Sequence, residues 1–214
     1  MCAAVPEKTP VNAAETKLLE SALRLFSQKG YEGTSIREII EGAGVTRPVL
    51  YYYFANKEAL FLRLVEDVFT EYTATIEQVL AEETTCRDRL SAVICNAFGI
   101  VEENLEAVRL ILQVFFSPPG QGPPLDKNRL AHKRFRLIEE IMSDGLERGE
   151  LSGGDAQSLA LVFVGIMDMH IMAKSNRPET RLSRAYGEGL VDLFLSGAGA
   201  EGRLATALTS PYRF

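Results

Sequence analysis

The sequence predicts an all-α fold, with a small helical head followed by a larger helical domain. Three observations support this. Apolar residues recur at spacings of three and four through most of the 214 residues, which is helical periodicity. The sustained alternation of apolar and polar residues that is typical of half-buried strands is absent. Helix start and stop signals, such as Ser35 with Glu38 and the later Gly44, separate the periodic segments.

Three short helices are expected before residue 58. Asn12, followed by Glu15, resembles a capping box and begins the first helix, which ends at Gly30. Ser35 begins the second helix, and the Gly42–Gly44 turn ends it. The third helix runs from Thr46 to about Phe54, with a proline inside its first turn, where the missing N–H costs little.

A long fourth helix, capped by Asn56, is expected from Lys57 to about Glu83, and five more follow it. Their expected ranges are Arg87–Glu103, Leu105–Phe116, Leu125–Arg148, Ala156–Lys174 and Leu182–Leu195. The Pro- and Gly-rich stretch 117–124 is expected to be a surface loop. We therefore divide the chain into a head (1–58, core 12–57), a helical domain (59–197) and a flexible tail (198–214).

The bulk composition excludes several classes of protein. No apolar run approaches the roughly 18–20 residues that span a bilayer, and residues 1–7 lack the pattern of a secretory signal, so we expect a cytoplasmic protein without a membrane segment. Cys2, Cys86 and Cys95 form no CxxC pair, which argues against a disulfide framework or a zinc site.

The net charge of −6 does not by itself suggest a nucleic-acid partner. Its distribution is more informative. Residues 1–58 contain seven Lys/Arg and seven Asp/Glu, so the excess acidity lies in the remainder of the chain. Residues 46–57 contain Arg47 and Lys57 and no acidic residue, which is compatible with a contact to DNA.

Residues 34–57 predict a helix-turn-helix, in which the second helix enters the major groove of DNA. Two short helices are joined by a Gly-containing turn, and the second begins with Thr46-Arg47-Pro48. The consecutive residues Tyr51, Tyr52 and Tyr53 point in three directions, so they cannot all lie in the core. A tyrosine ring can contact a thymine methyl, and its hydroxyl can reach a phosphate.

The residues around this motif closely resemble the N-terminal domain of TetR-family regulators. The resemblance covers about Ala13 to Val68 and includes Ser21-Ala-Leu-Arg-Leu-Phe-Ser-Gln-Lys-Gly-Tyr-Glu-Gly-Thr-Ser-Ile-Arg-Glu-Ile, Ala43-Gly-Val, Leu50-Tyr-Tyr-Tyr-Phe and Asn56-Lys-Glu. It implies a homodimer that binds operator DNA. It also implies a C-terminal domain that supplies dimer contacts and a pocket for a small ligand.

The resemblance further assigns roles to individual residues of the head. The expected contacts to base edges are Arg37, Arg47, Pro48 and Tyr51. The expected contacts to phosphates are Thr34, Thr46, Tyr52, Tyr53 and Lys57, and we add Ser35 to the DNA-binding set. Tyr53 departs from the family pattern, where this position is often His, although a tyrosine hydroxyl can still reach a phosphate.

Two sets of residues are candidates for function in the helical domain. The candidate ligand pocket contains Phe98, Phe115, Phe116, Met142, Phe163, Met167, Asp168 and His170. The candidate dimer interface contains Gly165, Met169, Met172, Leu190, Leu193 and Phe194. We expect no metal, because Asp168 and His170 are two apart and do not share a helix face. We expect no cofactor, since the sequence contains no Gly-rich phosphate loop.

These observations and the resemblance together predict a ligand-responsive transcriptional regulator. The resemblance favours a repressor, because repression is the commoner mode of the family. The protein would bind an inverted-repeat operator in double-stranded DNA as a homodimer and be released by an apolar or amphipathic effector. A regulator that is independent of effectors or controlled by a protein partner is an alternative. A helical enzyme with a vestigial head is another, but no nucleophile elbow or His-Glu-x-x-His motif is present, so we expect no enzyme.

Overall fold

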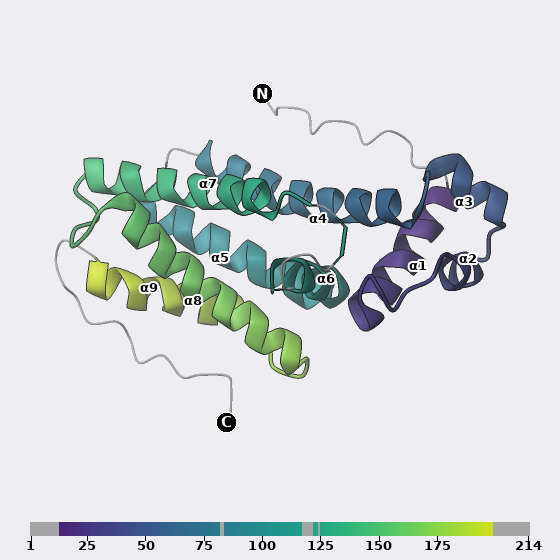
Figure 1. The fold of residues 1–214 in the computed structure, drawn as a ribbon. Helices are drawn as coiled ribbons and strands as arrows, with labels where there is room; N and C mark the ends of the chain where they lie inside the picture. Colours follow the sequence, from purple (N-terminus) through teal and green to yellow (C-terminus); the bar gives the residue numbers. More distant parts are fainter. Residues whose placement is uncertain (1–12, 82–83, 117–121, 124, 199–214) are drawn as a thin grey trace.

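The computed structural model describes residues 13–81, 84–116, 122–123 and 125–198 (Figure 1). Within these ranges the secondary-structure elements longer than one residue are helical. This confirms the predicted all-α fold. The helices are α1 (Ala13–Lys29), α2 (Ile36–Ala43), α3 (Arg47–Tyr53), α4 (Lys57–Leu80), α5 (Cys86–Glu103), α6 (Leu105–Phe116), α7 (Lys127–Glu147), α8 (Ala156–Asn176) and α9 (Arg184–Ala198).

The helices observed match those predicted, with small differences at their ends. α9 begins at Arg184 rather than Leu182, because Leu182 is buried and its N–H donates to the Glu102 carboxylate at 2.8 Å. α8 continues two residues beyond Lys174, to Asn176. The cap predicted at Asn12, most of the 117–124 loop and the tail from residue 199 lie outside the described residues.

Both ends of α2 form as the sequence predicts. The Ser35 side chain accepts from the Glu38 N–H, and the Glu38 carboxylate accepts from the Ser35 N–H, which completes a capping box at the start of α2. The Lys29 ammonium and the Ser35 groups lower the pKa of Glu38 to about 2. Gly44 then takes the left-handed conformation, with φ of 62°, and ends α2.

Two apolar cores meet along α4, which runs from the head into the larger domain (Figure 1). The first half of α4, from Leu60 to Phe69, packs with α1–α3. Leu110 and Val114 of α6 belong to this same core. The second half of α4 packs with α5, α7, α8 and α9. The apolar core of the head therefore extends past the predicted boundary at residue 58 and includes one face of α6.

Half-buried polar side chains between α7, α8 and α9 have intramolecular partners. Arg134 of α7 donates to both carboxylate oxygens of Asp168, at 2.7 and 2.6 Å. His170 lies between the Ile166 carbonyl (2.7 Å) and the Tyr186 hydroxyl (3.0 Å). Since buried charges and imidazoles need such partners, both residues are accounted for by the packing of α7, α8 and α9.

The packing predicts that two phenylalanines contribute very differently to the free energy of unfolding. Phe163 is fully buried, whereas Phe116 is 68% exposed. Phe163→Ala should therefore lower the free energy of unfolding by about 3–5 kcal/mol, and Phe116→Ala by less than about 0.5 kcal/mol. Urea unfolding of both variants at one protein concentration measures the difference, and equal losses would contradict the packing described here.

Candidate DNA-binding surface and head–body cleft

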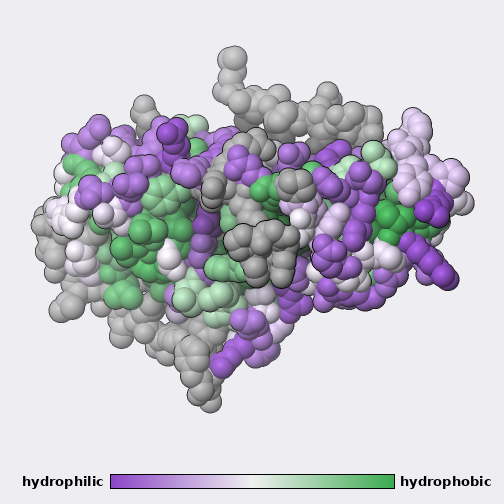
Figure 2. All heavy atoms as spheres, viewed as in Figure 1, coloured by the Kyte–Doolittle hydropathy of each residue, from purple (hydrophilic) through white to green (hydrophobic). Residues whose placement is uncertain are grey.

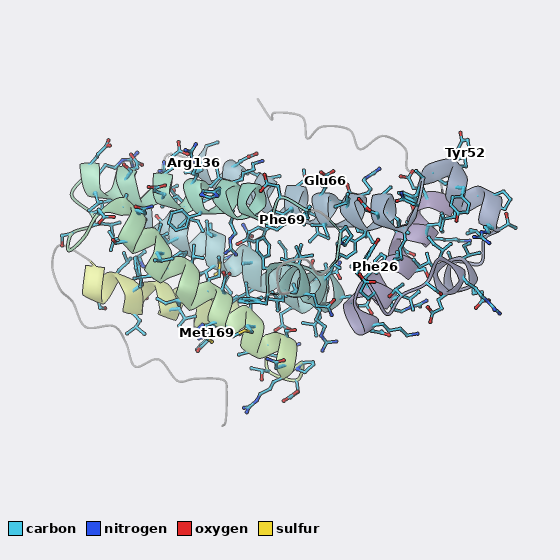
Figure 3. The ribbon with its side chains drawn as sticks, viewed as in Figure 1. Phe26, Tyr52, Glu66, Phe69, Arg136 and Met169 are labelled. Carbon is cyan, nitrogen blue, oxygen red and sulfur yellow. The ribbon has the colours of Figure 1, made fainter. Side chains whose placement is uncertain are left out.

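The outer face of α3 lies at the tip of the head, away from the larger domain (Figures 1 and 3). Leu50 on the inner face is fully buried and fixes the helix on the head core. The same turn places Tyr52 outward, 81% exposed, and Tyr51 44% exposed. Tyr53 is half-buried, and its ring packs edge-to-face on that of Tyr52 at 4.9 Å. Two of the three tyrosines are therefore directed into solvent, as the sequence predicts.

Arg47 adds a positive charge to this aromatic surface. It is exposed at the first turn of α3, and its guanidinium lies 5.6 Å from the centre of the Tyr51 ring. One guanidinium nitrogen lies 3.4 Å from the Tyr51 hydroxyl, which is a long hydrogen bond. Thr46 precedes it as N-cap without a side-chain capping bond, and Pro48 is exposed beside it. The result is a cationic, aromatic face that a DNA groove can accept.

The predicted contacts on α2 are placed less favourably. Arg37 is exposed but forms an i,i+4 ion pair with Glu41 at 2.7 Å, and the Ser35 hydroxyl bonds to Glu38. Thr34 is only 2% exposed and donates its hydroxyl to the Gly30 carbonyl. The Thr34 hydroxyl thus closes the end of α1, and its phosphate contact stays a prediction that this geometry does not favour.

Lys57 lies at the start of α4, as predicted, and its ammonium is engaged within the protein. Its contact to a phosphate stays a prediction. Its ammonium donates to the carbonyl oxygens of Tyr31 (2.9 Å) and Thr34 (3.0 Å) and lies 4.1 Å from the centre of the Tyr31 ring. It thus ties the start of α4 to the α1–α2 turn. Tyr31, whose ring also packs against Phe26 and Phe61, is a structural residue that the sequence argument missed.

Most of the predicted pocket residues lie inside the packed core. Four of them are 1% exposed or less: Phe98, Met142, Phe163 and Met167. The carboxylate of Asp168 forms an ion pair with Arg134. His170 lies beside Phe98 and Tyr186, and Phe115 packs on Phe69 in the head core. These seven residues fill space between helices, so their placement does not fit the predicted pocket.

A cleft of about 930 Å³ lies instead between the head and the larger domain. The cleft is lined by one of the predicted pocket residues, Phe116, and by one of the predicted dimer residues, Met172. Its described lining comes from the end of α1, α4, α6, the α6–α7 connection and the end of α8. The lining residues are Ser27, Lys29, Gly30, Tyr31, Glu32, Phe61, Arg109, Leu112, Gln113, Val114, Phe116, Gly122, Pro123, Leu125, Met172, Ser175 and Asn176.

The predicted dimer residues differ in exposure. Gly165, Met169 and Leu193 are exposed and Met172 is half-buried, whereas Leu190 and Phe194 are buried in the core of the larger domain. Leu161 and Val162, which were not predicted, are exposed on the same part of the molecule. Figure 2 shows apolar side chains gathered over α8 and α9, and Figure 3 shows Met169 on the outer side of α8.

α8 is also long and apolar enough to cross a membrane, the one such helix found in the described part of the chain. Its inner residues belong to the core of the larger domain, and its outer residues form the apolar face over α8 and α9. Length and composition alone are weak evidence for a span, because a helix packed in a protein core passes the same test.

The bonds of Lys57 predict a loss of stability when its ammonium is removed. Lys57→Ala should lower the free energy of unfolding by about 1–3 kcal/mol, because two carbonyl oxygens lose a charged donor. Lys17→Ala, at an exposed lysine of α1, is the matched control and should change it by less than about 0.5 kcal/mol. Urea unfolding gives both values; a Lys57 variant as stable as the control would show that the ammonium does not hold the turn.

Comparison with known proteins agrees with this geometry. Residues 18–64 match the family model described as bacterial regulatory proteins, tetR family. The chain is 20% identical over 184 residues to the fatty acid metabolism regulator protein of Bacillus subtilis, covering 85% of this chain and 93% of that protein. It is 37% identical over 138 residues to the HTH-type transcriptional repressor ComR of Escherichia coli, covering 62% and 65%.

Solved structures show the same fold along almost their whole length. The fatty acid degradation regulator FadR from Bacillus halodurans superposes with a TM-score of 0.76 at 19% identity, covering 89% of this chain and 97% of that one. FadR from Bacillus subtilis in complex with stearoyl-CoA gives 0.70 at 19% identity, covering 85% and 98%. The helix-turn-helix head, over residues 18–64, therefore matches the tetR family of bacterial regulatory proteins, and the larger helical domain shares the fold of these solved regulators.

Proposed function

We propose that the protein is a homodimeric, ligand-responsive transcriptional repressor that binds an inverted-repeat operator. The observation that carries this proposal is the outer face of α3, where Arg47, Tyr51 and Tyr52 are exposed on a helix that Leu50 anchors in the head core. A rigid helix with exposed cationic and aromatic side chains is suited to recognition in the major groove.

The exposed face over α8 and α9 supports the homodimer. Leu161, Val162, Met169 and Leu193 are each more than half exposed, which is unusual for large apolar side chains gathered on one part of a soluble protein. Two copies that pack α8 and α9 together would bury them in a four-helix bundle. The two α3 helices of such a dimer would enter successive major grooves, about 34–36 Å apart or slightly more.

The relatives support an amphipathic effector. One relative is named as a regulator of fatty acid metabolism, and one structural neighbour was solved with stearoyl-CoA. In the proposed mechanism, the effector binds the state in which the heads cannot reach both half-sites, so the operator is released. The cleft between head and larger domain gives such a ligand a place to act. An effector-independent regulator remains the second candidate, because the predicted pocket residues are packed in the core.

The same proposal makes the protein a cytoplasmic regulator without enzymatic activity. Its relatives are named as regulators and repressors. Its polar clusters, such as Arg134 with Asp168 and His170 with Tyr186, serve the packing of helices. No group of three His, Cys, Asp or Glu side chains among the described residues is gathered closely enough to hold a metal ion.

Selection from a random pool of duplex DNA should yield an inverted repeat. On that selected operator, Arg47→Ala should weaken binding by about 1–3 kcal/mol and relax the preference at one base pair in each half-site. Arg136→Ala, at an exposed arginine of α7 in the larger domain, is the matched control and should bind as the wild type does (Figure 3). Fluorescence anisotropy measures both affinities. A pool that yields no consensus, or an Arg47 variant equal to its control, would argue against recognition by α3.

Sedimentation equilibrium tests the dimer. The wild type should be a dimer at micromolar concentration, and Met169→Glu should shift it toward monomer, because two carboxylates would meet in an apolar interface. Tyr52→Glu places the same charge on the head and should leave the dimer intact. A monomeric wild type, or a Met169 variant that dimerises as tightly as the Tyr52 variant, would exclude this interface.

A further inference from the structure

The cleft is positioned between two parts of the molecule whose relative orientation matters for DNA binding. Its head side is formed by Ser27 and Tyr31 near the end of α1 and by Phe61 of α4. Its other side is formed by α6 and the end of α8, with Phe116 and Met172 among the contributors. Its volume of about 930 Å³ lies within the range of small-molecule sites.

The apolar part of the lining suits an extended hydrocarbon. Phe61, Leu112, Phe116, Leu125 and Met172 all border the cleft. Phe116 is 68% exposed, so part of this apolar surface faces solvent when the cleft is empty. Covering such a surface with a flexible apolar chain is favourable, because it removes apolar area from water. A methionine and a phenylalanine at the border can adjust to chains of different shape.

Three charged side chains border the cleft, the exposed Lys29 and Glu32 and the half-buried Arg109. Of these, Arg109 is the one that suits an anion. Lys29 is already paired with Glu38 at 2.6 Å. Arg109 makes one hydrogen bond, from its guanidinium to the Ser175 carbonyl at 3.1 Å, and no ion pair of Arg109 with a carboxylate is found among the described residues. A guanidinium has five N–H donors, so most of them are available to a carboxylate or phosphate in the cleft.

We propose that this cleft binds an amphipathic anion with an unbranched apolar tail, the anionic group pairing with Arg109. The tail lies along Phe61, Leu112 and Phe116. This inference rests on the proposed function, because it names the chemical class of the effector and the site at which it acts. It places that site between the head and the larger domain, and not in the core of the latter.

The contacts around the cleft explain how its occupant would affect DNA binding. In the present structure the Gln113 side chain donates to the Ser27 carbonyl at 2.9 Å, which joins α6 to α1 across the junction. The Tyr31 ring borders the cleft, while the Tyr31 carbonyl accepts from Lys57 at the start of α4. A ligand that touches both sides has different contacts for each orientation of the head, and this difference is what couples two sites.

Dodecanoate is the probe that tests this inference, with isothermal titration calorimetry as the readout. The wild type should bind dodecanoate, and 1-dodecanol, which lacks the charge, should bind at least about tenfold more weakly. Arg109→Ala should weaken dodecanoate binding about tenfold or more while leaving the affinity for 1-dodecanol within about twofold. Phe116→Ala, at an exposed side chain, should weaken both ligands. Arg136→Ala should change neither.

The outcomes separate this inference from the function on which it rests. If the wild type selects an operator but dodecanoate does not bind, or if Arg109→Ala binds dodecanoate as the control does, the cleft assignment is wrong and the DNA-binding regulator stands. If no operator is selected while dodecanoate binds with the pattern above, the cleft assignment stands and the proposed function fails. Since Arg109→Ala also removes the bond to Ser175, Phe116→Ala tests the cleft with a variant that loses little packing.

Discussion

The apolar core shared by α1, α4 and α6 is the constraint on which the rest of the structure depends. Phe26 and Leu60 from the first 69 residues lie in one cluster with Leu110 and Val114, so the head is packed against the larger domain and is not joined to it by a loose linker. Any change in the packing of α6 or α4 therefore acts directly on the position of α3. A regulator needs this property, because its effector and its operator must influence each other across the molecule.

The same packing explains why a residue predicted to touch DNA is engaged inside the protein. The α1–α2 turn has carbonyl oxygens that no helix satisfies, and Lys57 donates to two of them, at Tyr31 and Thr34. Three residues separate the end of α3 from the start of α4, so the position of α3 depends on that attachment. The outward face of α3 has the opposite character. Arg47 and Tyr52 make few contacts within the protein and are available to a partner.

Local patterns predicted most of the fold, and long-range packing accounts for what they missed. Periodicity and caps place helices within a few residues because both depend on neighbours in sequence, as the capping box at Ser35 and the left-handed Gly44 show. The same patterns cannot say which face of an apolar helix meets the core. Leu190 and Phe194 face inward while Leu193 faces outward, although all three have similar side chains. The cleft is even harder to predict from the sequence, since Arg109 and Met172 come together only in the folded chain.

Reciprocal coupling between operator and cleft is the most direct test of this account. Operator affinity can be measured at rising dodecanoate concentration until it no longer changes, and dodecanoate affinity can be measured with and without saturating operator. The account predicts that both affinities fall and that they fall by the same factor, since the coupling free energy belongs to both ligands. Operator affinity that is unchanged or increased at saturating dodecanoate would contradict it.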